Sequence, residues 1–201
     1  MIAAEALTGG LADAVFDAQS VFRAVLTTLS QPGRIIDLGH RVRPPVRLAA
    51  GAATVIATLA DDTTPVFLDA TFAGTPAADW IAFHTGAPIA DEPGDASFAV
   101  IGAPAALADF RPFAPGTAEY PDRSATLILV LDTLTEGAQL RLSGPGIDHS
   151  ATLAPSPLPP DFIPRMTANR ALFPRGVDLI LTAGSLVAGL PRSTRIAAEA
   201  A

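Results

Sequence analysis

The chain has 201 residues, a formal charge of -7 and no cysteine, and each of its 13 basic residues is an arginine. The missing lysines exclude mechanisms that need a side-chain amine, such as a Schiff base, a covalent anchor for pyridoxal phosphate or a P-loop lysine. The missing cysteines exclude thiolate nucleophiles, disulfides and cysteine-ligated metal clusters. A GC-biased genome also accounts for this composition, and the chemical exclusions hold whatever its origin.

Hydrophobic residues make up 49% of the chain and charged residues 16%, so we expect some apolar side chains to lie in a protein interface. The first ten residues lack the basic and apolar segments of a signal peptide. Long uncharged runs such as 48–60 and 179–191 are shorter than a membrane span. We therefore expect a soluble, cytoplasmic protein without a membrane partner. Its negative charge argues against general nucleic-acid binding.

The first half of the chain alternates helical and extended patterns. Residues 11–30 place apolar side chains at helical spacing, with Asp13 as the N-cap and Gln31-Pro32-Gly33 as the stop. A short strand follows over 34–38, and prolines require an extended loop over 41–47. A second helix is predicted over 48–59 and a buried strand over 66–68.

The same alternation continues in the second half, with a helix over 76–83, a strand over 97–101, a short helix over 104–110 and an apolar strand over 126–131. Strands 177–182 and 186–190 are predicted to pair antiparallel, with Gly184 at a positive φ in the turn. Residues 153–164 contain five prolines and form an extended connector. These patterns predict a single domain over 1–201, an α/β fold organised as a three-layer α/β/α sandwich with a mixed sheet.

Familiar catalytic motifs are mostly absent. The three histidines are scattered without a metal-ligand pattern, so no metal site is expected. Gly144-Pro145-Gly146 resembles the start of a dinucleotide-binding loop, but His149 stands where the third glycine is needed, which favours a plain turn.

The distribution of charge is more informative than the motifs. Residues 33–47 carry a net charge of +3, residues 48–161 carry -11, and residues 162–196 carry +4. If the two arginine-bearing segments converge, they form a place for a phosphate or phosphonate, which arginine binds bidentately. The alternative is that these arginines are solvated, or paired with acids of the middle segment.

Three short strings indicate where a site would lie. Phe83-His84-Thr85-Gly86 brings an imidazole and a hydroxyl to the end of a helix, where His84 is either a cap or a catalytic group. Arg175 stands at the start of one strand of the predicted hairpin, and Arg192 follows the other. The candidate ligand-binding residues are Arg34, His84, Thr85, Arg175 and Arg192.

Read together, these strings resemble the PhnH family over nearly the whole chain. The resemblance rests on several short strings in order: Val15-Phe16-Asp17-Ala18-Gln19-Ser20-Val21-Phe22-Arg23 with Gln31-Pro32-Gly33, Thr64-Pro65-Val66-Phe67-Leu68, Phe83-His84-Thr85-Gly86, Leu142-Ser143-Gly144-Pro145-Gly146-Ile147, Phe173-Pro174-Arg175-Gly176-Val177-Asp178-Leu179-Ile180-Leu181 and Leu190-Pro191-Arg192-Ser193-Thr194.

The resemblance implies a cytoplasmic homodimer that is similar in fold to pyridoxal-phosphate-dependent transferases but carries no cofactor. It also implies a subunit of the bacterial carbon-phosphorus lyase core complex, which joins an alkylphosphonate to the ribose of ATP, releases adenine and forms ribose 1-phosphonate 5-triphosphate. Such a subunit need not be catalytic alone. The alternatives are a stand-alone phosphonate- or nucleotide-binding protein and a purely structural dimerisation scaffold.

Overall fold

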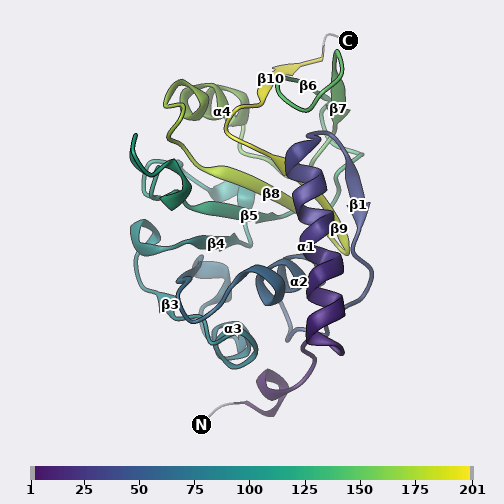
Figure 1. The fold of residues 1–201 in the computed structure, drawn as a ribbon, viewed down its shortest axis with the longest axis vertical. Coiled ribbons are helices and arrows are strands. Elements are labelled where there is room, and N and C mark those ends of the chain that lie inside the picture. Colours follow the sequence, from purple (N-terminus) through teal and green to yellow (C-terminus); the bar gives the residue numbers. More distant parts are fainter. Residues whose placement is uncertain (1–2, 200–201) are drawn as a thin grey trace.

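The centre of the molecule is a seven-stranded mixed β-sheet, seen in a computed structural model that describes residues 3–199 (Figure 1). The strand order is β1-β9-β8-β5-β4-β2-β3. The five strands from β8 to β3 run parallel, whereas β9 is antiparallel to both β8 and β1. The strands are β1 Ile35–Asp37, β2 Val66–Leu68, β3 Ile89–Ala90, β4 Phe98–Ile101, β5 Thr126–Val130, β8 Asp178–Ala183 and β9 Leu186–Leu190.

The predicted hairpin near the end of the chain is confirmed. Leu179 pairs with Leu190 and Ala183 with Leu186, so β8 and β9 are antiparallel neighbours. Gly184 has a φ of 58° in the turn, a conformation that glycine adopts without a steric penalty. The hairpin turns the parallel sheet into a mixed one, as the sequence predicted.

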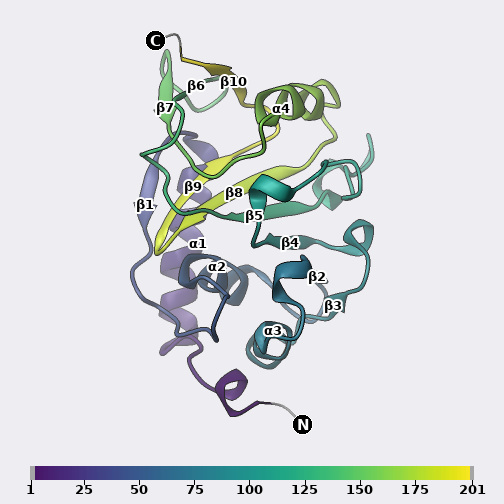
Figure 2. The ribbon, with the colours of Figure 1, turned by 180° about the vertical axis from the view of Figure 1, so that it is seen from behind.

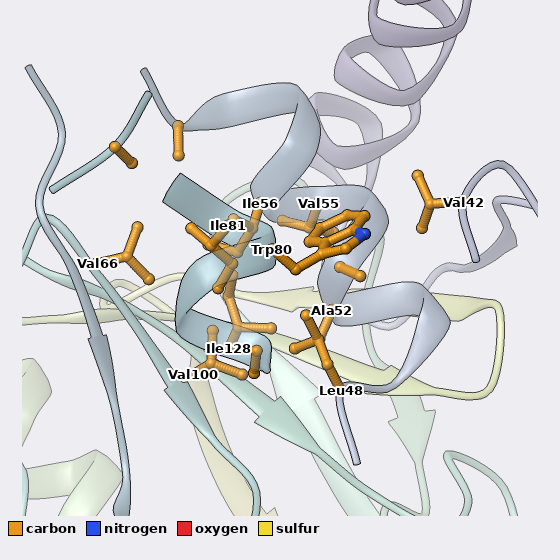
Figure 3. Packing of buried hydrophobic residues seen from close by; sticks show 14 of the residues in the cluster. Val42, Leu48, Ala52, Val55, Ile56, Val66, Trp80, Ile81, Val100 and Ile128 are labelled. Atoms are coloured by element: carbon orange, nitrogen blue, oxygen red, sulfur yellow. The ribbon is translucent and has the colours of Figure 1, made fainter. Parts of the chain in front are cut away.

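Three helices cover one face of the sheet: α1 (Ala14–Ser30), α2 (Ala50–Leu59) and α3 (Ala77–Thr85) (Figures 1 and 2). Their buried side chains form one cluster with residues of the strands. Figure 3 shows Trp80 of α3 in this cluster together with Val100 and Ile128 of the sheet. The small residues of α2 let it lie close to the sheet, since a Cβ at Gly51 would stand 2.7 Å from the carbonyl oxygen of Gly184.

Helix α1 begins as the sequence predicted, because the Asp13 carboxylate accepts hydrogen bonds from the N–H groups of Val15 and Phe16 at 3.1 and 3.0 Å. Its burial is less expected. Only Val21, Val25 and Thr28 are buried, while the apolar side chains at the start and along the outer face stay in solvent. The exposed fractions are 74% for Val15, 71% for Phe16, 51% for Phe22 and 55% for Leu26.

The other face of the sheet is covered by helix α4 (Phe162–Ala171), a second, three-stranded sheet and irregular segments. The small sheet has the order β10-β6-β7, with β6 Leu140–Ser143, β7 Ala151–Leu153 and β10 Arg195–Ala198. Leu127, Leu129 and Leu179 of the main sheet pack on this side with Phe162 and Met166 of α4. The chain therefore has an α/β fold with a mixed sheet that is buried on both faces.

The proline-rich connector and its surroundings differ from the prediction. β7 occupies residues 151–153 and α4 starts at Phe162, so the extended connector is limited to the residues between them. Pro164 lies in the first turn of α4, where its missing N–H would have no partner in the helix. The helix predicted over 104–110 is only a 3-10 turn, Pro104–Ala106, followed by a loop.

None of the helices within residues 3–199 has the length and apolar character that crossing a membrane requires.

Candidate functional site

His84 and Thr85 stand at the C-terminal end of α3, and His84 contacts the N-terminal segment. The indole N–H of Trp80 donates to the carbonyl oxygen of Thr8 at 2.9 Å, and Nε2 of His84 lies 3.2 Å from the same oxygen. A Cβ at Gly10 would stand 2.5 Å from Nδ1 of His84, so the imidazole is covered by residues 8–10. Thr85 donates to the carbonyl of Ile81 at 2.7 Å within α3.

Arg192 is the centre of a half-buried polar cluster that joins the segments before β5 and β8. Its Nε and Nη2 bind the Asp178 carboxylate at 3.1 and 2.5 Å. Nη1 donates to the carbonyl oxygens of Pro121 and Pro174 at 3.0 and 3.2 Å, and Nη2 also donates to Oγ of Ser124. These contacts use the full set of guanidinium donors, and the side chain is 11% exposed.

The other two candidate arginines are exposed. Arg34 donates from Nη1 to Oε1 of Gln31 at 2.8 Å, just before the edge strand β1. Arg175 follows Pro174, whose carbonyl accepts from Arg192. The structure therefore brings Arg175 and Arg192 into one region near the start of β8.

The five candidates do not gather at one place. In both views α3 lies at the end of the molecule near the N-terminus, whereas the start of β8 lies beside α4 (Figures 1 and 2). His84 and Thr85 are therefore separated from Arg175 and Arg192, and Arg34 precedes the edge strand β1. A ligand-binding role for these residues stays a prediction.

Two cavities border the irregular segment that follows β4. The first, which we call the α4 cavity, has a volume of about 430 Å³ and lies between α4 and residues 109–115. The second, the β2–β4 cavity, has a volume of about 360 Å³ and lies where these two strands end. Asp109 and Phe113 line both, so the two cavities are neighbours.

Asp69 marks the β2–β4 cavity. It follows directly after β2, and ligands of parallel α/β sheets bind at the carboxyl ends of strands. Its Oδ1 accepts from the N–H and the hydroxyl of Thr71, and its Oδ2 accepts from the N–H of Ala103 at 3.1 Å. The carboxylate thus ties the loop after β2 to the loop after β4. Asp69 was not among the predicted site residues, although an acidic residue after a predicted strand is a usable signal.

Ion pairs surround the mouth of the α4 cavity. The Arg165 guanidinium pairs with Asp161 and also donates to the carbonyl of Leu107. A hydrogen bond from Arg165 lowers the pKa of Asp161. The pKa of Asp109 is lowered first by the backbone N–H of Arg111 and then by its guanidinium, which lies 2.5 Å from the carboxylate. Both acids are therefore ionised at neutral pH. None of these four residues was among the predicted site residues.

Hydrogen bonds tie the wall of the α4 cavity to the main sheet at Asn169. Asn169 is buried, and its side-chain amide donates to the carbonyl of Val177 and accepts from the N–H of the same residue, both at 2.8 Å. This pair of bonds locks α4 to the start of β8.

Among residues 3–199, no three histidine, aspartate or glutamate side chains lie close enough together to hold a metal ion. The arrangement offers arginine as the only permanent cation for a ligand, because the sequence contains no lysine.

Comparisons with known proteins place the chain in a family. The family model described as bacterial phosphonate metabolism protein (PhnH) matches residues 9–197. A Rhizobium meliloti (strain 1021) protein named alpha-D-ribose 1-methylphosphonate 5-triphosphate synthase subunit PhnH is 44% identical over 192 residues, 96% of each chain. A Stutzerimonas stutzeri protein named putative C-P lyase subunit protein HtxG is 43% identical over 81 residues, 40% of this chain and 42% of its own. The chain therefore belongs to the PhnH family of bacterial phosphonate metabolism proteins.

Proposed function

We propose that the chain is a subunit of the synthase that makes ribose 1-methylphosphonate 5-triphosphate during phosphonate breakdown. The observation that carries the proposal is the 44% identity to the Rhizobium meliloti synthase subunit over 96% of both chains. The second relative, named a putative C-P lyase subunit, supports the same system.

The surface of the molecule supports a role inside a complex. The four exposed apolar side chains of α1, which we call the α1 patch, are Val15, Phe16, Phe22 and Leu26. Several large apolar side chains exposed on one helix are typical of a protein interface. We propose that another subunit of the synthase covers the α1 patch. A homodimer through the same patch is the alternative occupant.

The proposal keeps the finer expectations of the family resemblance. These are a cytoplasmic location, a likeness of the fold to pyridoxal-phosphate-dependent transferases, a three-layer arrangement and no bound cofactor. With no lysine in the sequence, a pyridoxal phosphate would have no covalent anchor in this chain. The chain contributes structure, or part of a substrate site, to the reaction of the complex.

Co-purification tests the subunit role. An affinity-tagged chain is co-expressed with the remaining subunits of the Rhizobium meliloti synthase and passed through size-exclusion chromatography. We expect co-elution in a stable stoichiometric ratio. The proposal would be contradicted if the chain eluted alone although circular dichroism shows that it is folded.

A stand-alone binding protein for phosphonates or nucleotides is the second candidate function, favoured by the two cavities beside residues 103–115. It predicts that the isolated chain gains melting temperature with millimolar ATP or methylphosphonate, because a ligand that binds only the folded state stabilises it. If neither ligand changes the melting temperature and the chain co-elutes with the other subunits, the subunit role is the function that stays.

A further inference from the structure

The α4 cavity has the size and the lining of a small-molecule site. Its volume of about 430 Å³ falls within the usual range of ligand pockets, about 300–1,000 Å³. Apolar side chains form most of the wall, among them the buried rings of Phe110 and Phe113. Such a wall favours a flat, apolar body of ring size over a fully hydrated ion.

Two arginines supply the polar part of the lining. Arg165 is 15% exposed, and its contacts with Asp161 and Leu107 are the only ones described within residues 3–199. Because a guanidinium has five N–H donors, several of those on Arg165 stay available to a ligand. Arg111 is 89% exposed. Because an exposed ion pair contributes little free energy, its guanidinium can leave Asp109 and bind the anionic group of a ligand at small cost.

We propose that the α4 cavity binds a small organic anion: an aromatic or heterocyclic body that carries a phosphonate or phosphate group. The body lies against Phe110, Phe113 and Leu172, and Arg165 and Arg111 hold the anionic group, which guanidinium groups bind bidentately. An organophosphonate and a nucleotide share this chemistry. None of the residues in this site is among the five that the sequence analysis selected.

The test uses the full chain and probes of defined structure. Phenylphosphonate has a ring and the anionic group, adenosine 5′-monophosphate has a larger heterocycle, and methylphosphonate has the anionic group with almost no body. Each is titrated into labelled protein and followed by the NMR signals of the Asn169 side-chain amide and neighbouring backbone amides. We expect phenylphosphonate or the nucleotide to bind with a Kd below about 1 mM, at least tenfold tighter than methylphosphonate. Which of the two binds more tightly identifies the source of the ligand.

Variants locate the binding. Ala168 lines the cavity at the surface of α4, so Ala168→Phe fills the space without disturbing the core and is expected to weaken binding at least tenfold. Arg165→Met is expected to do the same. Thr167→Phe is the matched control, because Thr167 is exposed on the same helix and does not line the cavity.

Three results would overturn the proposal: no binding by either ring-bearing probe, equal affinity for methylphosphonate, or binding that Ala168→Phe leaves unchanged. The subunit role proposed above is independent of the outcome, because it rests on sequence similarity and is tested by co-elution.

Discussion

Arg192 shows how a residue that sequence patterns offer as a ligand clamp can instead hold the fold together. The sequence places it after a strand in an arginine-rich segment, but its partners come from Pro121, Ser124, Pro174 and Asp178. Two of these partners are 68 and 71 residues away along the chain. No local pattern predicts contacts of such separation, so the site was less predictable than the strands.

Removing this guanidinium is expected to destabilise the isolated chain. Arg192→Ala removes the guanidinium donors of Asp178 and of two backbone carbonyls, and Asp178 keeps the backbone N–H of residue 192. Breaking a largely buried ion pair costs about 3–5 kcal/mol of unfolding free energy. In a chain of this length that corresponds to a fall of the melting temperature by about 6–20 °C. Calorimetry measures it. Arg195→Ala, at an exposed position in β10, is the control and should change little. A similar, small shift for both variants would contradict the account.

His84 poses the opposite question, because its position is compatible with a structural or a chemical role. Its ring lies on Trp80, with centroids 4.7 Å apart, and both side chains reach the carbonyl of Thr8. We therefore expect His84→Ala to increase the hydrogen exchange of residues 6–10, because the segment then loses one of the two side chains of α3 that reach the carbonyl of Thr8. Exchange that stays unchanged while the synthase complex loses activity would point to a catalytic role instead.

Acid sensitivity follows from several hydrogen-bonded carboxylates. The pKa of Asp17 is lowered first by the backbone N–H of Asp13 and then by Arg41, and the pKa values of Asp37, Asp61, Asp109 and Asp161 are also lowered. A carboxyl whose pKa is lower in the folded state stabilises the fold above its unfolded pKa and loses this effect as the pH falls through the folded value.

The free energy of unfolding should therefore fall as the pH drops below about 4. Urea denaturation at pH 5, 4 and 3 measures it, and Asp17→Asn should make the fall less steep. Stability that rises between pH 4 and 3 would show that these contacts are not present in solution.

At the scale of single elements, local pattern predicted most of the main sheet and little of the layer opposite the helices. Apolar runs and a turn glycine predict the β8–β9 hairpin and the buried strands. Helix α4 was not predicted, because three of its ten residues are arginine or proline and its apolar side chains are few. The three-stranded sheet was not predicted, because β7 and β10 are short, half-polar strands that pair with β6 and lack a clear local pattern of their own.

Helix α1 was predicted with its N-cap, but the sequence could not say which apolar residues face the core. Helical periodicity shows that side chains share a face, and only tertiary structure decides what that face meets. Here the α1 patch meets solvent in the isolated chain. Under the proposed function, the α1 patch is the surface on which another subunit docks.

Polar substitution on this face separates docking from folding. Phe22→Ser is expected to leave the melting temperature within a few degrees of the original, since the ring is 51% exposed, and to weaken association with the other synthase subunits at least tenfold. Phe83→Ser is the matched control, with a similarly exposed ring, 55%, on α3. Biolayer interferometry against the remaining subunits measures both. Equal loss, or no loss, in the two variants would remove the α1 patch from the interface.

At the scale of the whole molecule, the sequence contains neither lysine nor cysteine, and the candidate residues lie in separate regions of the part of the chain that the structure describes. Under the proposed function, such a subunit would contribute to the reaction together with its partners in the complex.

The central claim is that this chain is the PhnH-family subunit of a working synthase, and reconstitution tests it most directly. The Rhizobium meliloti synthase is assembled without its own PhnH subunit, supplied with ATP and methylphosphonate, and followed by ³¹P NMR. Addition of this chain is predicted to restore ribose 1-methylphosphonate 5-triphosphate formation to within about tenfold of the native complex. The absence of this product, although the folded chain is present in excess and the native subunit restores it, would contradict the claim.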